Sequence, residues 1–200
     1  NWMNPDGTGF FDANGNKKVL MSVMHANERK GEVPHIQKVY EESSYEVFHL
    51  DEEKFDDFEG MGDALWHYKR GLIWGGYGFR SSEEVYALIS DIYDVPVIKL
   101  ELLNESFYHL DTCLCILDEK TALIYPKALF ENVIEASKYE AEELFACNAT
   151  SPDGKNVFIQ QGCTDVNQNL RDHGFKVHEF STSEYLKSGG SVFCMKMMLW

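Results

Sequence analysis

The sequence is short of basic residues, and this shortage limits the kinds of partner that the protein can bind. Its 200 residues include 18 Lys and Arg against 33 Asp and Glu, which gives a formal net charge of −15. Binding to nucleic acid needs a basic stripe that neutralises phosphates, and the sequence has none. The composition therefore excludes a nucleic-acid partner, and it is compatible with a cationic small-molecule substrate.

Long apolar runs and a disulfide framework are also lacking. No window approaches 18 uncharged apolar residues, and no basic segment followed by an apolar stretch opens the sequence. We therefore expect no membrane span and no signal peptide. The five cysteines are an odd number without framework spacing, which indicates free thiols in a reducing compartment, the cytoplasm.

What is present is a recurring pattern of two short strands, a helix and a third strand. The hydrophobic share of 44% and the aromatic share of 14% are those of a folded globular protein. In the clearest copy, a hairpin over residues 64–79 precedes a helix over 81–94 and a strand over 97–103. Ser81 is the predicted N-cap of this helix, and Glu84 completes a capping box.

Three further copies are less regular. They comprise a strand over 17–24 with a helix over 32–44 and a strand over 45–50; strands over 113–118 and 121–126 with a helix over 127–140 and no clear closing strand; and strands over 144–150 and 156–162 with a helix over 164–173 and a strand over 175–180. An orphan strand over 191–198 needs a partner from an N-terminal repeat that is largely missing. We therefore expect one α/β domain over residues 1–200, truncated at its N-terminus and built as a closed ring of repeats.

Cys194 follows a pair of glycines, Gly189 and Gly190, in the stretch SGGSVFC. A cysteine in an apolar strand is commonly a small buried hydrophobic residue. The glycines favour a second interpretation, since they let a ligand approach the backbone closely and would leave Cys194 placed as a nucleophilic thiolate. The stretch alone leaves both interpretations open.

His109 and Asp111 lie two residues apart in FYHLDTCLC, which we predict to be a strand. On one strand face, they could act as a proton carrier and a cation-binding carboxylate, or form an orienting pair inside a core. His109, Cys113 and Cys115 would share that face as well. One strand gives at most three ligands without a second cluster, so we expect no metal site.

Charged residues mark two further glycine-rich stretches. Glu59 and Asp63 occupy a turn in FEGMGDAL, and Arg80 follows the glycines of GGYGFRSS. Arg80 and Arg29 could pair with a substrate carboxylate in a bidentate manner or form surface salt bridges, and the Gly/Asp turn alone indicates only a turn.

Taken in order, the motifs FEGMGDAL, GYGFRSS, FYHLDTCLC and GGSVFC resemble the guanidine-modifying enzymes of the pentein fold. These are the arginine deiminases, arginine dihydrolases, dimethylarginine hydrolases and amidinotransferases, and the bacterial arginine dihydrolase/deiminase branch is the most similar. The resemblance runs from Asn1 to about Leu199. It implies an α/β propeller of ββαβ repeats with pseudo-fivefold symmetry, whose first repeat is largely missing here.

The resemblance also implies a role for each candidate residue. Cys194 would be the nucleophile, His109 the general acid and base, Asp63 and Asp111 the carboxylates that hold the guanidinium, and Glu59 their neighbour. Arg29 and Arg80 would bind the α-carboxylate of the substrate, Asn1 would contact the substrate, and Gly190 would line its path to the sulfur.

The implied function is cysteine-dependent hydrolysis of the guanidino group of arginine through a covalent S-alkylthiouronium. A dihydrolase would release ornithine, ammonia and carbon dioxide, and a deiminase would release citrulline and ammonia. An amidinotransferase, a dimethylarginine hydrolase and a non-catalytic pentein binding protein are the alternatives. The resemblance implies neither a cofactor nor a metal, and it is compatible with an oligomer.

Overall fold

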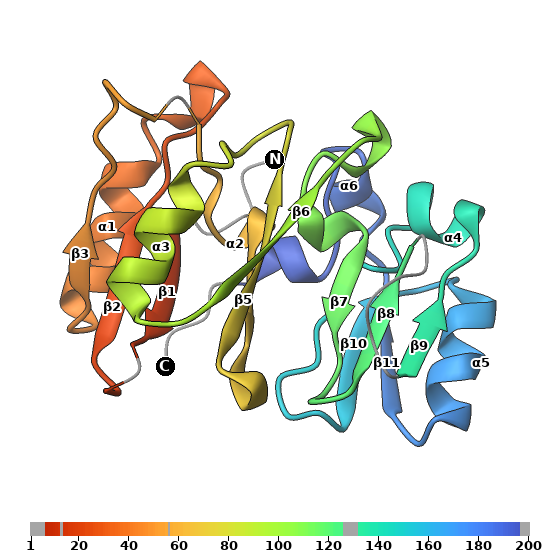
Figure 1. The fold of residues 1–200 in the computed structure, drawn as a ribbon. Helices are drawn as coiled ribbons and strands as arrows, with labels where there is room; N and C mark the ends of the chain where they lie inside the picture. Colours follow the sequence, from red (N-terminus) through yellow and green to blue (C-terminus); the bar gives the residue numbers. More distant parts are fainter. Residues whose placement is uncertain (1–6, 13, 56, 126–131, 197–200) are drawn as a thin grey trace. The chain divides into compact units, whose positions relative to one another are not determined.

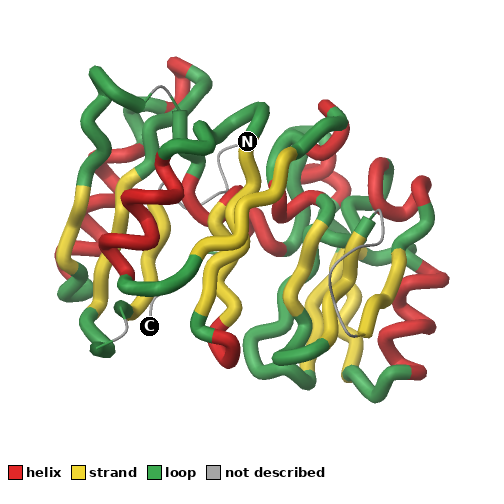
Figure 2. Tube along the Cα trace, viewed as in Figure 1, coloured by secondary structure: helices red, strands yellow, loops and turns green. Residues whose placement is uncertain are grey.

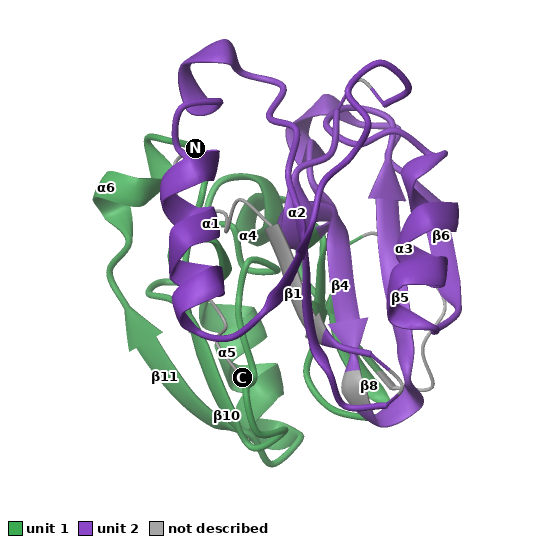
Figure 3. Cartoon of the chain, turned by 90° about the vertical axis from the view of Figure 1, so that its left-hand side faces the viewer, with its two compact units in different colours: residues 1, 111–196 green, residues 2–110, 197–200 purple. Residues whose placement is uncertain are grey.

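The computed structural model describes residues 7–12, 14–55, 57–125 and 132–196 (Figures 1 and 2). The chain divides into two compact units, coloured separately in Figure 3. Unit 2 comprises residues 2–110 and 197–200, and unit 1 comprises residues 1 and 111–196. Each unit holds two small sheets, and each sheet follows the ββαβ pattern wholly or in part. The predicted recurrence of this pattern is therefore confirmed.

The first repeat of unit 2 is a complete ββαβ motif. β1 (Gly7–Phe11) pairs antiparallel with β2 (Lys17–Met21), α1 (Val33–Glu42) follows, and β3 (Glu46–Phe48) pairs parallel with β2. Its core consists of the buried residues Val19, Met21, Tyr40 and Tyr45. The rings of Tyr40 and Tyr45 meet edge to face with centroids 5.0 Å apart, an arrangement favoured by the aromatic quadrupole.

The second repeat of unit 2 carries most of the predicted motifs. A short helix, α2 (Gly60–Asp63), leads into β4 (Ala64–His67), which pairs antiparallel with β5 (Leu72–Tyr77); α3 (Val85–Tyr93) then leads to β6 (Val97–Glu101), parallel to β5. The predicted capping box is wrong. The N-cap of α3 is Glu84, which makes no capping hydrogen bond with its side chain, and the hydroxyl of Ser81 donates to Asp63 instead.

The first repeat of unit 1 differs from its prediction. β7 (Leu114–Ile116) and β8 (Thr121–Ile124) form the expected hairpin, and β9 (Asn132–Glu135) pairs parallel with β8. The helix predicted over 127–140 is wrong over Asn132–Glu135, which form β9, the closing strand that the pattern does not reveal, and it is confirmed only at its end, where α4 (Lys138–Glu142) begins. Val133 and Ile134 are β-branched, which favours a strand. Residues 126–131 lie outside the described part.

The second repeat of unit 1 begins after α4 (Lys138–Glu142). β10 (Asn156–Gln160), α5 (Thr164–Asp172) and β11 (Lys176–Phe180) confirm the last predicted strand, helix and strand, with β10 and β11 parallel. The strand predicted over 144–150 is reduced to one bridge between Thr150 and Phe158. A short α6 (Ser183–Leu186) follows β11. None of the helices in the described ranges is long and apolar enough to cross a membrane.

Two predicted strands that carry candidate residues are wrong, the first of them before Leu114, where β7 begins, and the second over its described residues. Residues 107–115 contain a 3-10 helix over Leu110–Thr112, so His109 and Asp111 do not share a strand face. Likewise, Cys194 lies in a 3-10 helix over Phe193–Met195, and residues 197–200 are outside the described part. In both segments, backbone amides donate to a buried side chain instead of a neighbouring strand.

Candidate active site

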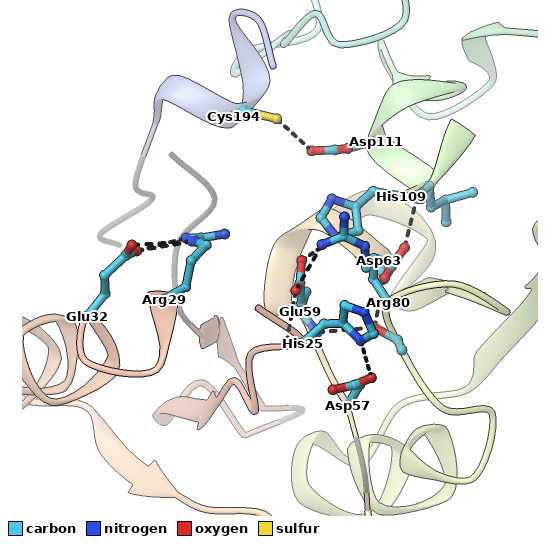
Figure 4. Close-up of polar contacts among 12 residues, drawn as sticks. His25, Arg29, Glu32, Asp57, Glu59, Asp63, Arg80, His109, Asp111 and Cys194 are labelled. Carbon is cyan, nitrogen blue, oxygen red and sulfur yellow. Dashed lines mark hydrogen bonds and ion pairs between the residues drawn. The ribbon is translucent and has the colours of Figure 1, made fainter. Parts of the chain in front are cut away.

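The centre of the polar network in unit 2 is a buried pair, Glu59 and His109 (Figure 4). Nε2 of His109 lies 2.7 Å from Oε2 of Glu59, and both side chains are fully buried. Burial raises the pKa of Glu59, but the hydrogen bond and charge of His109, with the charge of Arg80, lower it to about 2. Glu59 is therefore a carboxylate at neutral pH that fixes the imidazole and favours its protonated form.

Both partners of this pair are anchored through Asp63 and Ser81. Oδ1 of Asp63 accepts from the amide of Leu110 at 2.9 Å, and Oδ2 accepts from the hydroxyl of Ser81 at 2.7 Å. The same hydroxyl accepts from the amide of Glu59 at 3.1 Å. A closed circuit results, which holds the backbone of Glu59 at one end and the residue after His109 at the other.

Asp63 is fully buried, and burial raises its pKa to about 6, although His109, Ser81 and Leu110 oppose the rise. Gly76 of β5 is packed against the carboxylate. A Cβ there would lie 2.7 Å from Cβ of Leu110 and 3.0 Å from Oδ1 of Asp63. Gly76, the second glycine of GGYGFRSS, is thus required by close packing.

Arg80 lies beside the Glu59–His109 pair. Its Nη1 is 3.5 Å from Oε1 of Glu59, and its guanidinium lies 5.2 Å from the ring centroid of Tyr108. The backbone amide of His25, a residue outside the predicted motifs, donates to Oε1 of Glu59 at 3.1 Å. Its ring Nδ1 lies 2.6 Å from Oδ2 of Asp57. These groups surround one carboxylate with donors (Figure 4).

Arg29 ends a 3-10 helix over Asn27–Arg29 and is almost fully buried. Its Nη2 lies 2.9 Å from Oε2 of Glu32, and its Nε lies 3.2 Å from the same oxygen (Figure 4). The structure therefore places Arg29 in an ion pair with Glu32. Asn1, the other predicted substrate contact near the start of the sequence, lies outside the described residues.

The centre of the polar network in unit 1 is Cys194. Its Sγ donates to Oδ2 of Asp111 at 3.2 Å, and both residues are fully buried (Figure 4). Burial raises the pKa of Cys194 well above its usual value, and the charge of Asp111 and the hydrogen bond to it raise it further. Cys194 is therefore a neutral thiol held against a carboxylate.

Lys196 brings a positive charge to the same cluster. Its ammonium lies 3.4 Å from the ring centroid of Phe193. Burial lowers its pKa to about 8, although the charges of Asp111, Cys115 and Cys194 oppose the fall. The sequence pattern around Cys194 contains this lysine, but its proximity to Asp111 depends on the fold.

The glycines before Cys194 form a tight turn after α6. Gly189 has a φ of 77°, which a glycine adopts without strain, and its amide donates to the carbonyl of Leu186 at 3.0 Å. Gly190 is buried, and its amide donates to the carbonyl of Tyr185 at 3.3 Å. In the described ranges of the chain, no group of three or more His, Cys, Asp or Glu is arranged to hold a metal ion.

A model of the family "N,N dimethylarginine dimethylhydrolase, eukaryotic" matches residues 8–200. The bifunctional arginine dihydrolase/ornithine cyclodeaminase ArgZ of Synechocystis sp. is 35% identical over 193 residues, which cover 90% of this chain and 27% of ArgZ. The N(G),N(G)-dimethylarginine dimethylaminohydrolase of Mycobacterium tuberculosis is 39% identical over 147 residues, covering 68% of this chain and 47% of the relative. This chain therefore spans about a quarter of ArgZ and about half of the mycobacterial protein.

Solved structures agree with the sequence comparison. A substrate-bound mutant of the N-terminal domain of ArgZ has a TM-score of 0.85 at 31% identity and covers 97% of this chain and 73% of its own. A dimethylarginine dimethylaminohydrolase adduct with S-methyl-L-thiocitrulline has a TM-score of 0.78 at 20% identity, a likeness of fold, covering 97% and 74%. The chain thus has the α/β pentein fold, is related to hydrolases of guanidino groups, and belongs to the N,N-dimethylarginine dimethylhydrolase family.

Proposed function

We propose that this protein hydrolyses the guanidino group of arginine or a related compound, with Cys194 as nucleophile and His109 as general acid and base. The observation that carries the proposal is the buried contact of 3.2 Å between the thiol of Cys194 and the carboxylate of Asp111. A guanidinium is a planar cation whose N–H groups match a carboxylate. Binding to Asp111 therefore brings its central carbon to the sulfur.

Binding of the cation also activates the thiol. Burial and the charge of Asp111 keep Cys194 protonated in the free protein. The positive charge of a guanidinium paired with Asp111 offsets that negative charge, which lowers the pKa of Cys194. The substrate itself thus promotes the thiolate, and the sulfur stays unreactive without it.

The reaction then proceeds in two steps. As the cation binds, Cys194 releases its thiol proton to solvent. The sulfur then forms a bond to the guanidino carbon, and the C–N bond to one terminal nitrogen breaks while His109 protonates the leaving amine. An S-alkylthiouronium remains on Cys194. His109, now neutral, takes a proton from water, whose oxygen bonds to the carbon as the C–S bond breaks. Glu59 supports both steps because it holds the imidazole and stabilises its protonated form.

Two substrates are favoured by different relatives. The cyanobacterial relatives are arginine dihydrolases, and that reaction needs a second round of hydrolysis after citrulline to give ornithine, a second ammonia and carbon dioxide. The family model and the mycobacterial relative favour dimethylarginine, which would release dimethylamine and citrulline. Transfer to an amine acceptor and binding without catalysis are the remaining outcomes.

Product analysis of the full-length protein distinguishes these possibilities. We expect either arginine or dimethylarginine to yield citrulline, with ornithine in addition if the protein is a dihydrolase. Ammonia and dimethylamine, measured separately, identify the leaving group. The absence of any product from both compounds would contradict hydrolysis and leave a binding protein.

We further predict that Cys194→Ser lowers turnover by at least about 10³-fold while arginine still binds. With wild-type protein at low pH, where hydrolysis of the intermediate slows, mass spectrometry should detect a covalent adduct on Cys194. Cys113→Ser is the matched control, since Cys113 is a partly exposed cysteine of the same unit. Loss of arginine binding in Cys194→Ser would instead indicate a structural cysteine.

A further inference from the structure

Asn148 is a fully buried residue of unit 1 that lies beside Cys194. It lies in LFACNAT, in the turn after α4, where the sequence predicts a strand. Its main chain and its amide make five hydrogen bonds around the nucleophile, with Ser191, Phe193, Cys194 and Asp111 as the partners. Four of these five bonds are made by the side chain of this one residue.

The oxygen side of Asn148 holds the backbone of the cysteine segment. Oδ1 accepts from the amide of Ser191 at 2.9 Å and from the amide of Cys194 at 3.2 Å. The main-chain carbonyl of Asn148 accepts from the amide of Phe193 at 2.9 Å. Three bonds to one residue therefore fix residues 191–194, and with them the direction of the Cys194 side chain.

The nitrogen side of Asn148 faces the reacting atom. Nδ2 donates to Sγ of Cys194 at 3.2 Å and to the carbonyl of Asp111 at 3.1 Å. A thiolate accepts a hydrogen bond more strongly than a thiol does, so this donor favours the ionised sulfur. It opposes burial and the charge of Asp111, which raise the pKa of Cys194.

We propose that Asn148 is a catalytic residue that stabilises the Cys194 thiolate through Nδ2–H and holds the cysteine segment through Oδ1. The proposal rests on the proposed function, in which Cys194 is the nucleophile. The donor acts twice in that reaction. It stabilises the thiolate before the C–S bond forms, and it stabilises the same thiolate when the sulfur leaves during hydrolysis of the thiouronium.

Asn148→Asp separates the two roles. One carboxylate oxygen keeps the acceptor for the amides of Ser191 and Cys194, while the other replaces the donor at the sulfur with a negative charge. The rate of adduct formation on Cys194, followed by mass spectrometry at saturating arginine, should fall about 10- to 100-fold near neutral pH. The pH at which this rate reaches its plateau should rise by about one to two units. Above that pH, the rate of the variant should equal the plateau rate of the wild-type protein.

A structural role alone gives a different result. The carboxylate of Asn148→Asp raises the pKa of Cys194 by its own charge as well as by the lost donor, so Asn148→Ala, which removes the donor without adding a charge, is measured beside it. If Asn148 only held the segment, the plateau of Asn148→Ala would fall at an unchanged pH, and that result overturns the proposal. Asn169→Asp is the matched control, since it adds the same charge on the exposed side of α5 and should leave the profile unchanged. Thermal melting verifies that both variants fold, and Asn148→Ala carries the test alone if Asn148→Asp does not fold.

The two proposals fail separately. If Cys194→Ser retains turnover, the proposed function is wrong whatever Asn148 does. If Cys194→Ser is inactive but Asn148→Ala reaches its plateau at the wild-type pH, the proposed function stands and the role of Asn148 is wrong.

Discussion

The two units of the molecule bury charge in opposite ways. In unit 2, the carboxylate of Glu59 is surrounded by His109, Arg80 and the amide of His25, and its pKa falls to about 2. In unit 1, the carboxylate of Asp111 lies against a neutral thiol, and the pKa of Cys194 rises. In unit 2, the donors around Glu59 offset its charge, whereas in unit 1 the charge of Asp111 opposes ionisation of Cys194 even with the ammonium of Lys196 in the same cluster.

This difference indicates how the work is divided. A compensated network such as Glu59–His109 is ready to move a proton without rearrangement, which suits a general acid and base. A network in which a carboxylate opposes ionisation of a neighbouring thiol suits substrate binding, because a guanidinium relieves the opposition.

The two buried aspartates should respond very differently to neutralisation. Asp111→Asn removes the partner of the guanidinium, and we expect kcat/KM for the preferred guanidino substrate to fall about 10²- to 10³-fold. Asp63→Asn should change it less than about 10-fold. Both oxygens of Asp63 already accept from Leu110 and Ser81, and an amide can keep the circuit with its oxygen toward Leu110 and its nitrogen toward Ser81.

Steady-state kinetics of the two variants test this directly. If kcat/KM falls equally in both variants, Asp63 would have the role that the family resemblance implies, that of a second carboxylate that binds the guanidinium. Stability gives an independent check. The folded pKa of Asp63, about 6, lies above its ordinary value of 3.8, so ionisation costs stability above pH 6. The cost disappears as pH falls from 6 towards 3.8, and Asp63→Asn should remove this pH dependence.

Neutralising Glu59 is expected to have a smaller effect than neutralising Asp111. In Glu59→Gln, the backbone amide of residue 59 still donates to the hydroxyl of Ser81, so the circuit persists. The negative charge that favours the protonated ring of His109 is lost. We expect kcat to fall about 10²-fold with little change in KM, measured by product release. A rise in KM at constant kcat would contradict a role in proton transfer.

Local patterns of the sequence predict the repeats but not the geometry of the two networks. The hairpin of β4 and β5 and the helix α5 follow from turn residues and periodicity, which are local. Residues 107–115 and 191–198 look like strands because they are apolar, but the amides of Leu110 and Cys194 bond to side chains 47 and 46 residues away. Such bonds between distant parts of the chain have no signature in a local pattern.

The candidate residues show the same limit. Cys194 is singled out by its glycines and by the family resemblance, but the stretch itself leaves a buried hydrophobic role open. Asp111 and Asn148, which contact the sulfur, come from other parts of the chain. Ser81 was predicted to cap α3, and only the fold reveals that its single hydroxyl serves both Glu59 and Asp63.

Lys196 should give the smallest change, and activity and stability should move in opposite directions. Burial lowers the pKa of its ammonium to about 8, so below pH 8 the folded protein carries a buried charge at a cost that fades as pH rises towards 10.5. Lys196→Met removes that cost and keeps the apolar contact with Phe193, which should raise the melting temperature by about 2–4 °C at neutral pH.

Loss of the positive charge near Cys194 should also slow adduct formation about two- to fivefold. Lys196→Arg keeps the charge and is the matched control for the rate. A fall in both stability and rate would mean that Lys196 only packs against Phe193, whereas a gain in stability with a loss in rate assigns its charge to the nucleophile.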